Sequence, residues 1–183
     1  MTRRFNQLSE SEMTDAQRES YRAIVSGPRA GARGPFNALL RSPELADHAQ
    51  KLGAYVRFKS SLPAALNELA ILVTARYWSA QFEWYAHAQL AEKAGLAVDV
   101  ISDISRRKRP GKLSKEETAI YNFCNELHEM KHVSDAAFDA VKELFGERGV
   151  IDLIGACGYY TMVSMVLNVE RHPLPDGKPD PLK

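Results

Sequence analysis

The chain has 183 residues, a formal net charge of +1, 45% hydrophobic residues and 26% charged residues, values that suit a single globular domain over residues 1–183. This nearly neutral charge argues against nucleic acid or an anionic membrane surface as the main partner. The two cysteines, Cys124 and Cys157, form no CxxC motif and are too few for a disulfide framework, so we expect reduced thiols. No apolar run follows the basic residues near the N-terminus, and we therefore expect a cytoplasmic protein.

Helix start signals and breaks alternate along the first third of the chain. Thr14 and Gln17 have the spacing of a capping box and predict a helix that ends near Val25. The segment 26–35 (SGPRAGARGP) contains three glycines and two prolines, which rule out a regular element. Pro43 then stands at the first position of another predicted helix.

The same signals continue through the rest of the chain. Pro63 begins a strongly apolar helix, and the helix after it ends at Gly95. Ser114, with a glutamate three residues later, predicts a helix from Lys115 to Met130. Ser134 caps the next helix, which a glycine closes at position 146.

The last predicted helix, 150–169, is apolar nearly all round and approaches the length of a membrane span. Asp152, Asn168 and two glycines interrupt it, and the mean hydropathy of the whole chain is −0.32. We therefore expect a buried core or interface helix, and no membrane partner. Residues 173–183 are rich in proline and predict an extended tail. Because no run alternates at period two, the pattern predicts an all-α protein of about seven or eight helices.

A carboxylate interrupts the apolar helix that follows Pro63. Glu68 is surrounded in the sequence by leucine, isoleucine and valine residues. A buried carboxylate must be paired, hydrogen-bonded or neutral, and desolvation raises its pKa, as suits a general acid or proton carrier. The structural alternative is a salt bridge to a basic residue such as Arg57 or Arg76.

The next helix carries Glu83 and His87, whose spacing of four places them on one face. A carboxylate beside an imidazole raises the pKa of the histidine and orients the ring, so that the pair can transfer a proton near neutral pH. The alternative is an ordinary surface contact between the two side chains. Glu68 in the preceding helix favours the first interpretation, because two neighbouring helices then offer two carboxylates and one histidine.

These residues belong to the segment NELAILVTARYWSAQFEWYAHAQLAEKAGL (67–96), which resembles the carboxymuconolactone decarboxylase family and its alkylhydroperoxidase D-like members. The resemblance rests on Glu68, on the block EWYAH that ends at His87, and on the closing AGL, and it is strongest over residues 62–104. The family implies an all-helical fold that assembles into homotrimers or homohexamers, with the site between packed helices.

Two flanking segments, GPFNALLRSPELA (34–46) and GYYTMVSMVLN (158–168), resemble a longer subfamily. The peroxidase branch of the family implies a glutamate on the first helix and then a CxxCxxxH motif. In this chain Ala80 and Glu83 stand at the two cysteine positions, while His87 stands at the histidine position. A disulfide-cycling peroxidase needs an attacking thiolate and a resolving thiol, so these residues disfavour that activity.

The decarboxylase branch resembles this chain more closely, because it has a glutamate at the Glu83 position. It implies acid–base chemistry without metal or cofactor, a decarboxylation or a related lactone reaction, on a small carboxylate or lactone substrate. In that interpretation His87 reprotonates carbon, Glu83 orients His87, and Glu68 is a second proton carrier. The alternatives are a peroxide-reducing antioxidant protein and an oligomeric binding module without catalysis.

Four further residues are weaker candidates for binding substrate. Arg29 and Arg33 lie in the glycine-rich loop, where arginines can bind a carboxylate, although solvated arginines are the alternative. Tyr77 and Trp84 can line an apolar pocket, although aromatic residues at helical spacing more often belong to a core.

The segment 128–132 (HEMKH) matches the HExxH pattern of zinc proteases, in which two histidines one turn apart bind the metal. The match lies at the end of a predicted helix, and Ser134 already caps the next one. We therefore expect no metal site there.

Overall fold

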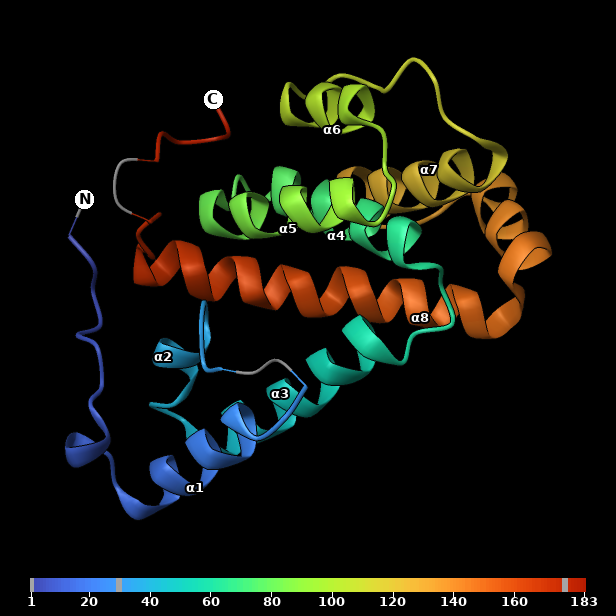
Figure 1. Cartoon of the computed structure of the whole chain (residues 1–183). Coiled ribbons are helices and arrows are strands. Elements are labelled where there is room, and N and C mark those ends of the chain that lie inside the picture. Colours follow the sequence, from blue (N-terminus) through green and yellow to red (C-terminus); the bar gives the residue numbers. More distant parts are fainter. Residues whose placement is uncertain (1, 29–30, 176–177) are drawn as a thin grey trace.

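The computed structural model describes residues 2–28, 31–175 and 178–183, and these contain eight α-helices, one 3₁₀ turn and no strand (Figure 1). The all-α prediction is thus confirmed. The elements are η1 (Glu10–Glu12), α1 (Asp15–Val25), α2 (Phe36–Leu39), α3 (Pro43–Phe58), α4 (Ala64–Tyr77), α5 (Gln81–Lys93), α6 (Val98–Ser105), α7 (Lys115–Met130) and α8 (Asp135–Glu170).

Local capping determines where the helices begin. At α1, the Thr14 hydroxyl accepts a hydrogen bond from the backbone of Gln17, whose side chain accepts one from the backbone of Thr14. Ser114 and Glu117 form the same reciprocal pair at α7. Each box satisfies two backbone amides that a helix N-terminus leaves unpaired, and both helices start where the sequence predicts.

The long helix α8 runs through the middle of the fold, with α4 and α5 on one side and α1 and α3 on the other (Figure 1). Gly146 has a φ of 68° and divides α8 into the two helices that the sequence predicts. By length and composition α8 can cross a membrane, but 56% of its apolar window is buried inside the fold. Helices α3, α4 and α7 pack against it, which makes α8 a core helix.

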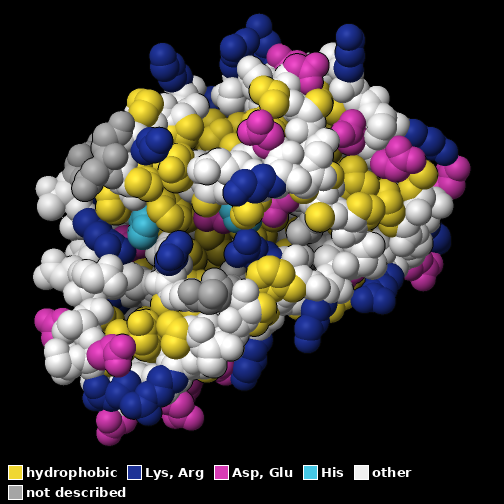
Figure 2. Space-filling view, viewed as in Figure 1, with side chains coloured by type: hydrophobic (Ala, Val, Ile, Leu, Met, Phe, Trp, Pro, Cys, Tyr) yellow, Lys and Arg dark blue, Asp and Glu magenta, His cyan; other side chains and the backbone are white. Residues whose placement is uncertain are grey.

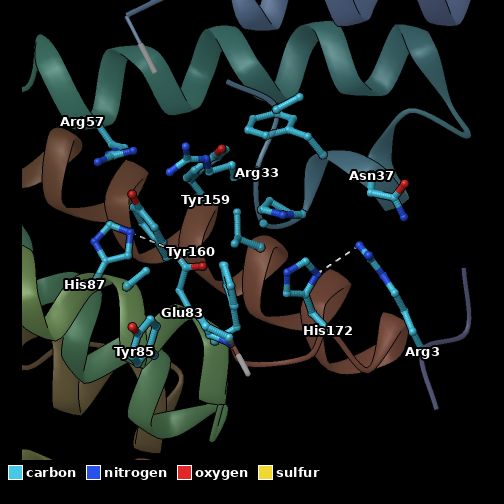
Figure 3. A pocket seen from close by; sticks show the side chains of 18 of the residues that line it. Arg3, Arg33, Asn37, Arg57, Glu83, Tyr85, His87, Tyr159, Tyr160 and His172 are labelled. Atoms are coloured by element: carbon cyan, nitrogen blue, oxygen red, sulfur yellow. Dashed lines mark hydrogen bonds and ion pairs between the residues drawn. The ribbon is translucent and has the colours of Figure 1, made fainter. Parts of the chain in front are cut away.

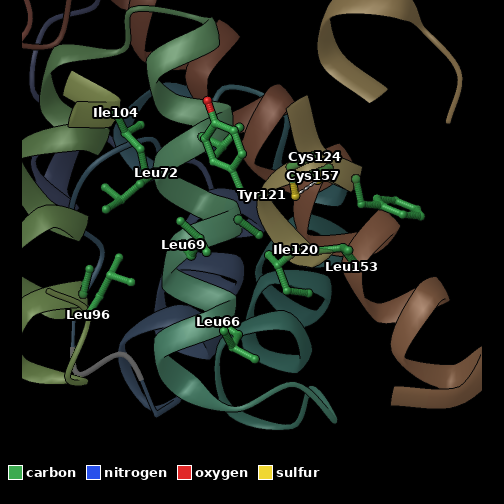
Figure 4. Packing of buried hydrophobic residues seen from close by; sticks show 14 of the residues in the cluster. Leu66, Leu69, Leu72, Leu96, Ile104, Ile120, Tyr121, Cys124, Leu153 and Cys157 are labelled. Carbon is green, nitrogen blue, oxygen red and sulfur yellow. Dashed lines mark hydrogen bonds between the residues drawn. The ribbon is translucent and has the colours of Figure 1, made fainter. Parts of the chain in front are cut away.

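The core is centred on α4, which α5, α7 and α8 cover (Figure 4). Leu69, Ile71 and Leu72 are completely buried, which explains why this helix is apolar on nearly every side. Burial of each such side chain contributes about 1.5–3 kcal/mol. Ile71 faces the other way and belongs to a second cluster, with residues of α1, α2, α3 and α8. The resulting core gives α4 and α5 a rigid relative position, and the candidate site depends on that position.

The end of the C-terminal tail is anchored beside α5. The described residues beyond His172 form no helix, in line with an extended tail. Leu182 is 4% exposed, and its backbone N–H and C=O both hydrogen-bond the side chain of Gln81 at 2.9 and 2.7 Å. The tail therefore returns to the N-terminus of α5.

Candidate active site

His87 is held by a carboxylate on each ring nitrogen. Nδ1 lies 2.6 Å from Oε2 of Glu68, and Nε2 lies 2.9 Å from Oε1 of Glu83. Glu68 comes from α4, whereas Glu83 and His87 come from adjacent turns of α5, which packs against α4. The structure thus brings together the three residues that the sequence predicts as an acid–base site.

The trio is largely shielded from water. His87 is 4% exposed, Glu83 is 5% exposed, and the side chain of Glu68 is 13% exposed. Burial by itself lowers the pKa of His87, but the charge of Glu83 and the hydrogen bonds to both carboxylates outweigh it and raise this pKa to about 9. The ring is therefore an imidazolium at neutral pH, the one form in which both nitrogens donate hydrogen bonds.

The structure contains neither of the alternatives that the sequence left open, a salt bridge from Glu68 to an arginine or a surface contact between Glu83 and His87. Glu68 pairs with His87 and makes no salt bridge to Arg57 or Arg76. Arg76 instead donates to the backbone oxygen of Lys183 at 2.8 Å. Because Glu83 and His87 are both buried, their contact is an interior one, where the weak screening by solvent strengthens it.

A cavity of about 600 Å³ lies beside the trio, a size suited to a small organic molecule. Figure 2 shows basic side chains around a hollow in this face, with histidine and acidic side chains inside it. Segments distant in the sequence form its wall, and these are the residues that line it: Arg3, Gln7, Ala32, Arg33, Gly34, Pro35, Phe36, Asn37, Arg57, Phe82, Glu83, Tyr85, Ala86, His87, Tyr159, Tyr160, Val163, His172 and Pro175.

Both flanking segments of the family resemblance contribute to this wall. Residues 34–37 line the cavity from the start of the first segment, and Tyr159, Tyr160 and Val163 line it from the second. The glutamate–histidine block of α5 supplies Glu83 and His87 to the same wall. Three stretches that carry the resemblance therefore meet at one place in the fold.

Two guanidinium groups, those of Arg33 and Arg57, point into the cavity (Figure 3). Within the described part of the chain, neither makes an ion pair with a carboxylate. Arg3 differs, because it pairs at 2.6 Å with Glu170, a fully buried carboxylate. Free guanidinium groups match a carboxylate in both charge and shape. Arg33 was predicted from its loop, whereas the sequence suggested Arg57 only as a salt-bridge partner.

Tyr160 offers an unused hydroxyl next to the imidazole. Its ring packs edge-on against His87, with 4.9 Å between ring centroids, and the residue is 2% exposed. The hydroxyl has no hydrogen-bond partner among the described residues. Burial raises the pKa of Tyr160 well above its usual value, so the group stays a neutral donor. A buried donor without a partner costs about 1–3 kcal/mol.

The remaining candidates lie elsewhere or outside the described residues. Trp84 is 4% exposed in the core around α4, and Tyr77 stacks on His128 with 5.0 Å between ring centroids. Both aromatic residues are therefore packing residues, and neither is part of the cavity wall described above. Arg29 lies outside the residues that the structure describes.

The HEMKH segment does not have the geometry of a zinc site. Helix α7 ends at Met130, and Lys131 is left-handed with a φ of 66°, so His132 does not follow His128 on the same helical face. His128 Nε2 instead lies 2.8 Å from the hydroxyl of Thr74. In residues 2–28, 31–175 and 178–183, no group of three or more His, Cys, Asp or Glu side chains is placed to hold a metal ion.

The helix arrangement is the alkylhydroperoxidase D-like fold, as the sequence resemblance implied. Among solved structures, a protein of unknown function from Agrobacterium tumefaciens, described as a candidate antioxidant defence protein AhpD, is similar to this chain, with a TM-score of 0.61 and 18% identity. The similarity covers 78% of this chain and 99% of that one, and at this identity it shows the fold alone. No family model and no curated protein sequence matches the chain.

Proposed function

We propose that this protein is a cofactor-free acid–base enzyme, related to the carboxymuconolactone decarboxylases, that decarboxylates a small carboxylate substrate or carries out a related lactone reaction. One observation carries the proposal: the carboxylate–imidazolium–carboxylate trio forms the wall of a cavity into which two unpaired arginines point. A buried imidazolium supplies a proton, and the arginines supply the charge that an anionic substrate needs.

The geometry supports a division of roles that differs from the sequence expectation. Glu83 and His87 belong to the cavity wall, whereas Glu68 is not among the described residues that form it. Glu68 holds Nδ1, and we assign to it the orienting role that the sequence suggested for Glu83. His87 Nε2 and Glu83 then form the pair that exchanges a proton with substrate.

In the proposed reaction, Arg33 and Arg57 bind the substrate carboxylates. The carbon–carbon bond to the departing carboxylate breaks, carbon dioxide leaves, and the bonding electrons pass into an adjacent carbonyl to give an enolate. The Tyr160 hydroxyl donates a hydrogen bond to the enolate oxygen. The His87 imidazolium then gives its Nε2 proton to carbon, directly or through Glu83, and recovers a proton from water.

A thiol peroxidase at this site is the weaker alternative. The similar Agrobacterium protein carries an antioxidant description, but here Ala80 and Glu83 occupy the positions where the peroxidase motif has cysteines. The side chain on the turn before His87 is thus a carboxylate, which transfers protons but does not reduce a peroxide.

The deciding experiment incubates the purified protein with a panel of small carboxylic acids and lactones, and measures release of carbon dioxide and loss of lactone. We expect turnover that needs no added metal or reductant and that disappears in Glu83→Gln. Rapid peroxide consumption with dithiothreitol, at many turnovers per chain, but no turnover of any carboxylate or lactone, would support the antioxidant alternative. Saturable binding of a carboxylate without turnover would support the binding module.

The protein is also proposed to be a cytoplasmic homotrimer or homohexamer that binds neither nucleic acid nor membrane. Apolar side chains exposed along α3 and α8 support self-association, among them Leu52, Phe58, Ile151, Met165 and Val169, which are 43–65% exposed. Exposed apolar side chains gathered on adjacent helices mark surfaces that other proteins cover.

A further inference from the structure

The two cysteines, which are 33 positions apart in the sequence, meet inside the fold. Cys124 on α7 and Cys157 on α8 have sulfur atoms 3.5 Å apart, and both residues are free thiols (Figure 4). Both are buried, at 0% and 2% exposure. A disulfide bond has a length of about 2.05 Å, so the sulfurs need to approach by only about 1.5 Å to form one.

The surroundings of the two thiols are different. Hydrogen bonds from the Cys124 thiol and from His128 lower the pKa of Cys157, whereas burial raises the pKa of Cys124. The hydroxyl of Thr74 donates to the carbonyl of Ala70 at 2.9 Å, so its oxygen accepts from His128 Nε2, which holds the ring in place. Cys157 is therefore the thiol that ionises first, and Cys124 is the neighbour placed to attack it.

A small cavity borders the same histidine. His128 lines a second cavity of about 100 Å³, together with Arg76, Arg107 and Lys108. A water molecule occupies roughly 30 Å³, so this space holds molecules as small as hydrogen peroxide. His128 thus lines the cavity and also hydrogen-bonds Cys157.

From this geometry we propose that Cys124 and Cys157 are a redox modification site, which a small hydroperoxide converts into an intrachain disulfide between α7 and α8 and which thiol reductants restore. Neither cysteine lines the cavity beside His87, so the cysteine pair is independent of the trio around that residue. The proposal therefore stands whether or not the acid–base activity is found.

The atoms and electrons balance with hydrogen peroxide as the oxidant. The Cys157 thiolate attacks one peroxide oxygen, the O–O bond breaks, and the leaving hydroxide takes the thiol proton to form water. Cys124 then attacks the sulfur of the Cys157 sulfenic acid, so that an S–S bond forms, the S–O bond breaks, and a second water leaves. In total, two thiols lose two electrons and two protons to one peroxide.

The test treats the native full-length protein with hydrogen peroxide and counts free thiols after denaturation. We expect the count to fall from two to none, with a Cys124–Cys157 cross-link in the peptide map, a monomeric chain on a non-reducing gel, and full reversal by dithiothreitol. Treatment with diamide, which spares methionine, should produce the same cross-link. Two free thiols that survive both oxidants would overturn the proposal.

Single variants test the order of the steps. Cys124→Ser should stop at a Cys157 sulfenic acid that dimedone traps, whereas Cys157→Ser should react at least ten times more slowly than the native protein. Alanine variants at the same positions replace the serine variants if serine disturbs the core. Circular dichroism checks that the helices remain. Equal reactivity of Cys124 and Cys157 in the two single variants would contradict the assigned roles.

Discussion

Glu68 Oε2 lies 2.6 Å from Nδ1 of His87, although the two residues are 19 positions apart and belong to different helices. This contact turns a pair on one helix, Glu83 and His87, into a trio with both ring nitrogens engaged. Because both partners are carboxylates, the ring is held protonated and in one orientation. The first two predictions follow from that arrangement.

Removal of the proton-transferring groups should strongly slow turnover while the helical fold remains. Glu83→Gln and His87→Gln are each expected to lower kcat about 10²–10⁴-fold, the usual contribution of general acid–base catalysis. Glu92→Gln makes the same chemical change at an exposed position of α5 and serves as the control, with an unchanged kcat. Turnover by Glu83→Gln at the native rate would remove Glu83 from the reaction.

The stability of the protein should fall in alkaline solution because of His87. Its pKa rises from 6.5 to about 9 on folding, so its contribution is fully present below pH 6.5 and is lost as the pH rises through about 9. The change is up to about 3 kcal/mol in the free energy of unfolding. Urea unfolding between pH 6 and pH 10 measures it, and His87→Gln should show a much flatter profile. An equally steep loss in that variant would assign the effect to other groups.

Arg33 and Arg57 should govern affinity for anionic substrates. Each arginine that hydrogen-bonds a substrate carboxylate contributes about 1.5–3 kcal/mol, so Arg57→Gln is expected to raise KM about 10–100-fold with a smaller effect on kcat. Arg57→Lys keeps the charge but loses the planar guanidinium group that binds a carboxylate through two hydrogen bonds. Its KM should lie between that of the native protein and that of Arg57→Gln. Steady-state kinetics on one carboxylate substrate gives the comparison. An unchanged KM in both variants would exclude Arg57 from substrate binding.

Tyr160→Phe should lower the activity of the protein without lowering its stability. The hydroxyl has no partner among the described residues, so its removal is expected to leave the free energy of unfolding unchanged or to raise it by about 1 kcal/mol. The same change should lower kcat, because the enolate oxygen loses its donor. Urea unfolding and kinetics on the same sample test both effects. A destabilised variant with native kcat would make Tyr160 a purely structural residue.

The exposed apolar surface of α8 should mediate self-association. Ile151 is 65% exposed, and a lysine there places a charge where we propose that a second copy packs. Ile151→Lys is expected to shift the molar mass measured by light scattering from that of an oligomer toward 20.4 kDa, the mass of one chain. Lys142→Gln, on a more polar stretch of the same helix, is the control. A native protein that runs as a monomer would contradict the assembly outright.

Signals confined to one or two helical turns could be interpreted from the sequence without knowledge of the fold. The capping boxes at Thr14 and Ser114 placed the starts of α1 and α7, and the spacing of four placed Glu83 beside His87. Gly146 likewise marked the break in α8, because only a residue without a Cβ readily combines a φ of 68° with a ψ of 179°. In each case the atoms that interact are close neighbours along the chain.

Glu68 is an intermediate case. Its place in an apolar helix showed that it needed a partner, but periodicity could not choose between His87 and an arginine. The family resemblance favoured the acid–base interpretation, and the packing of α4 on α5 decided the partner.

The sequence by itself determined the all-α class, most helix boundaries and the chemistry-bearing block on α5. Only the tertiary structure decided that Arg57 and Tyr160 face that block, that Tyr77 and Trp84 do not, and that the two cysteines touch. The physical reason is the range of the forces involved. Capping and helical spacing act between residues a few positions apart, whereas the cavity and the thiol pair arise where the core packs distant segments against α8.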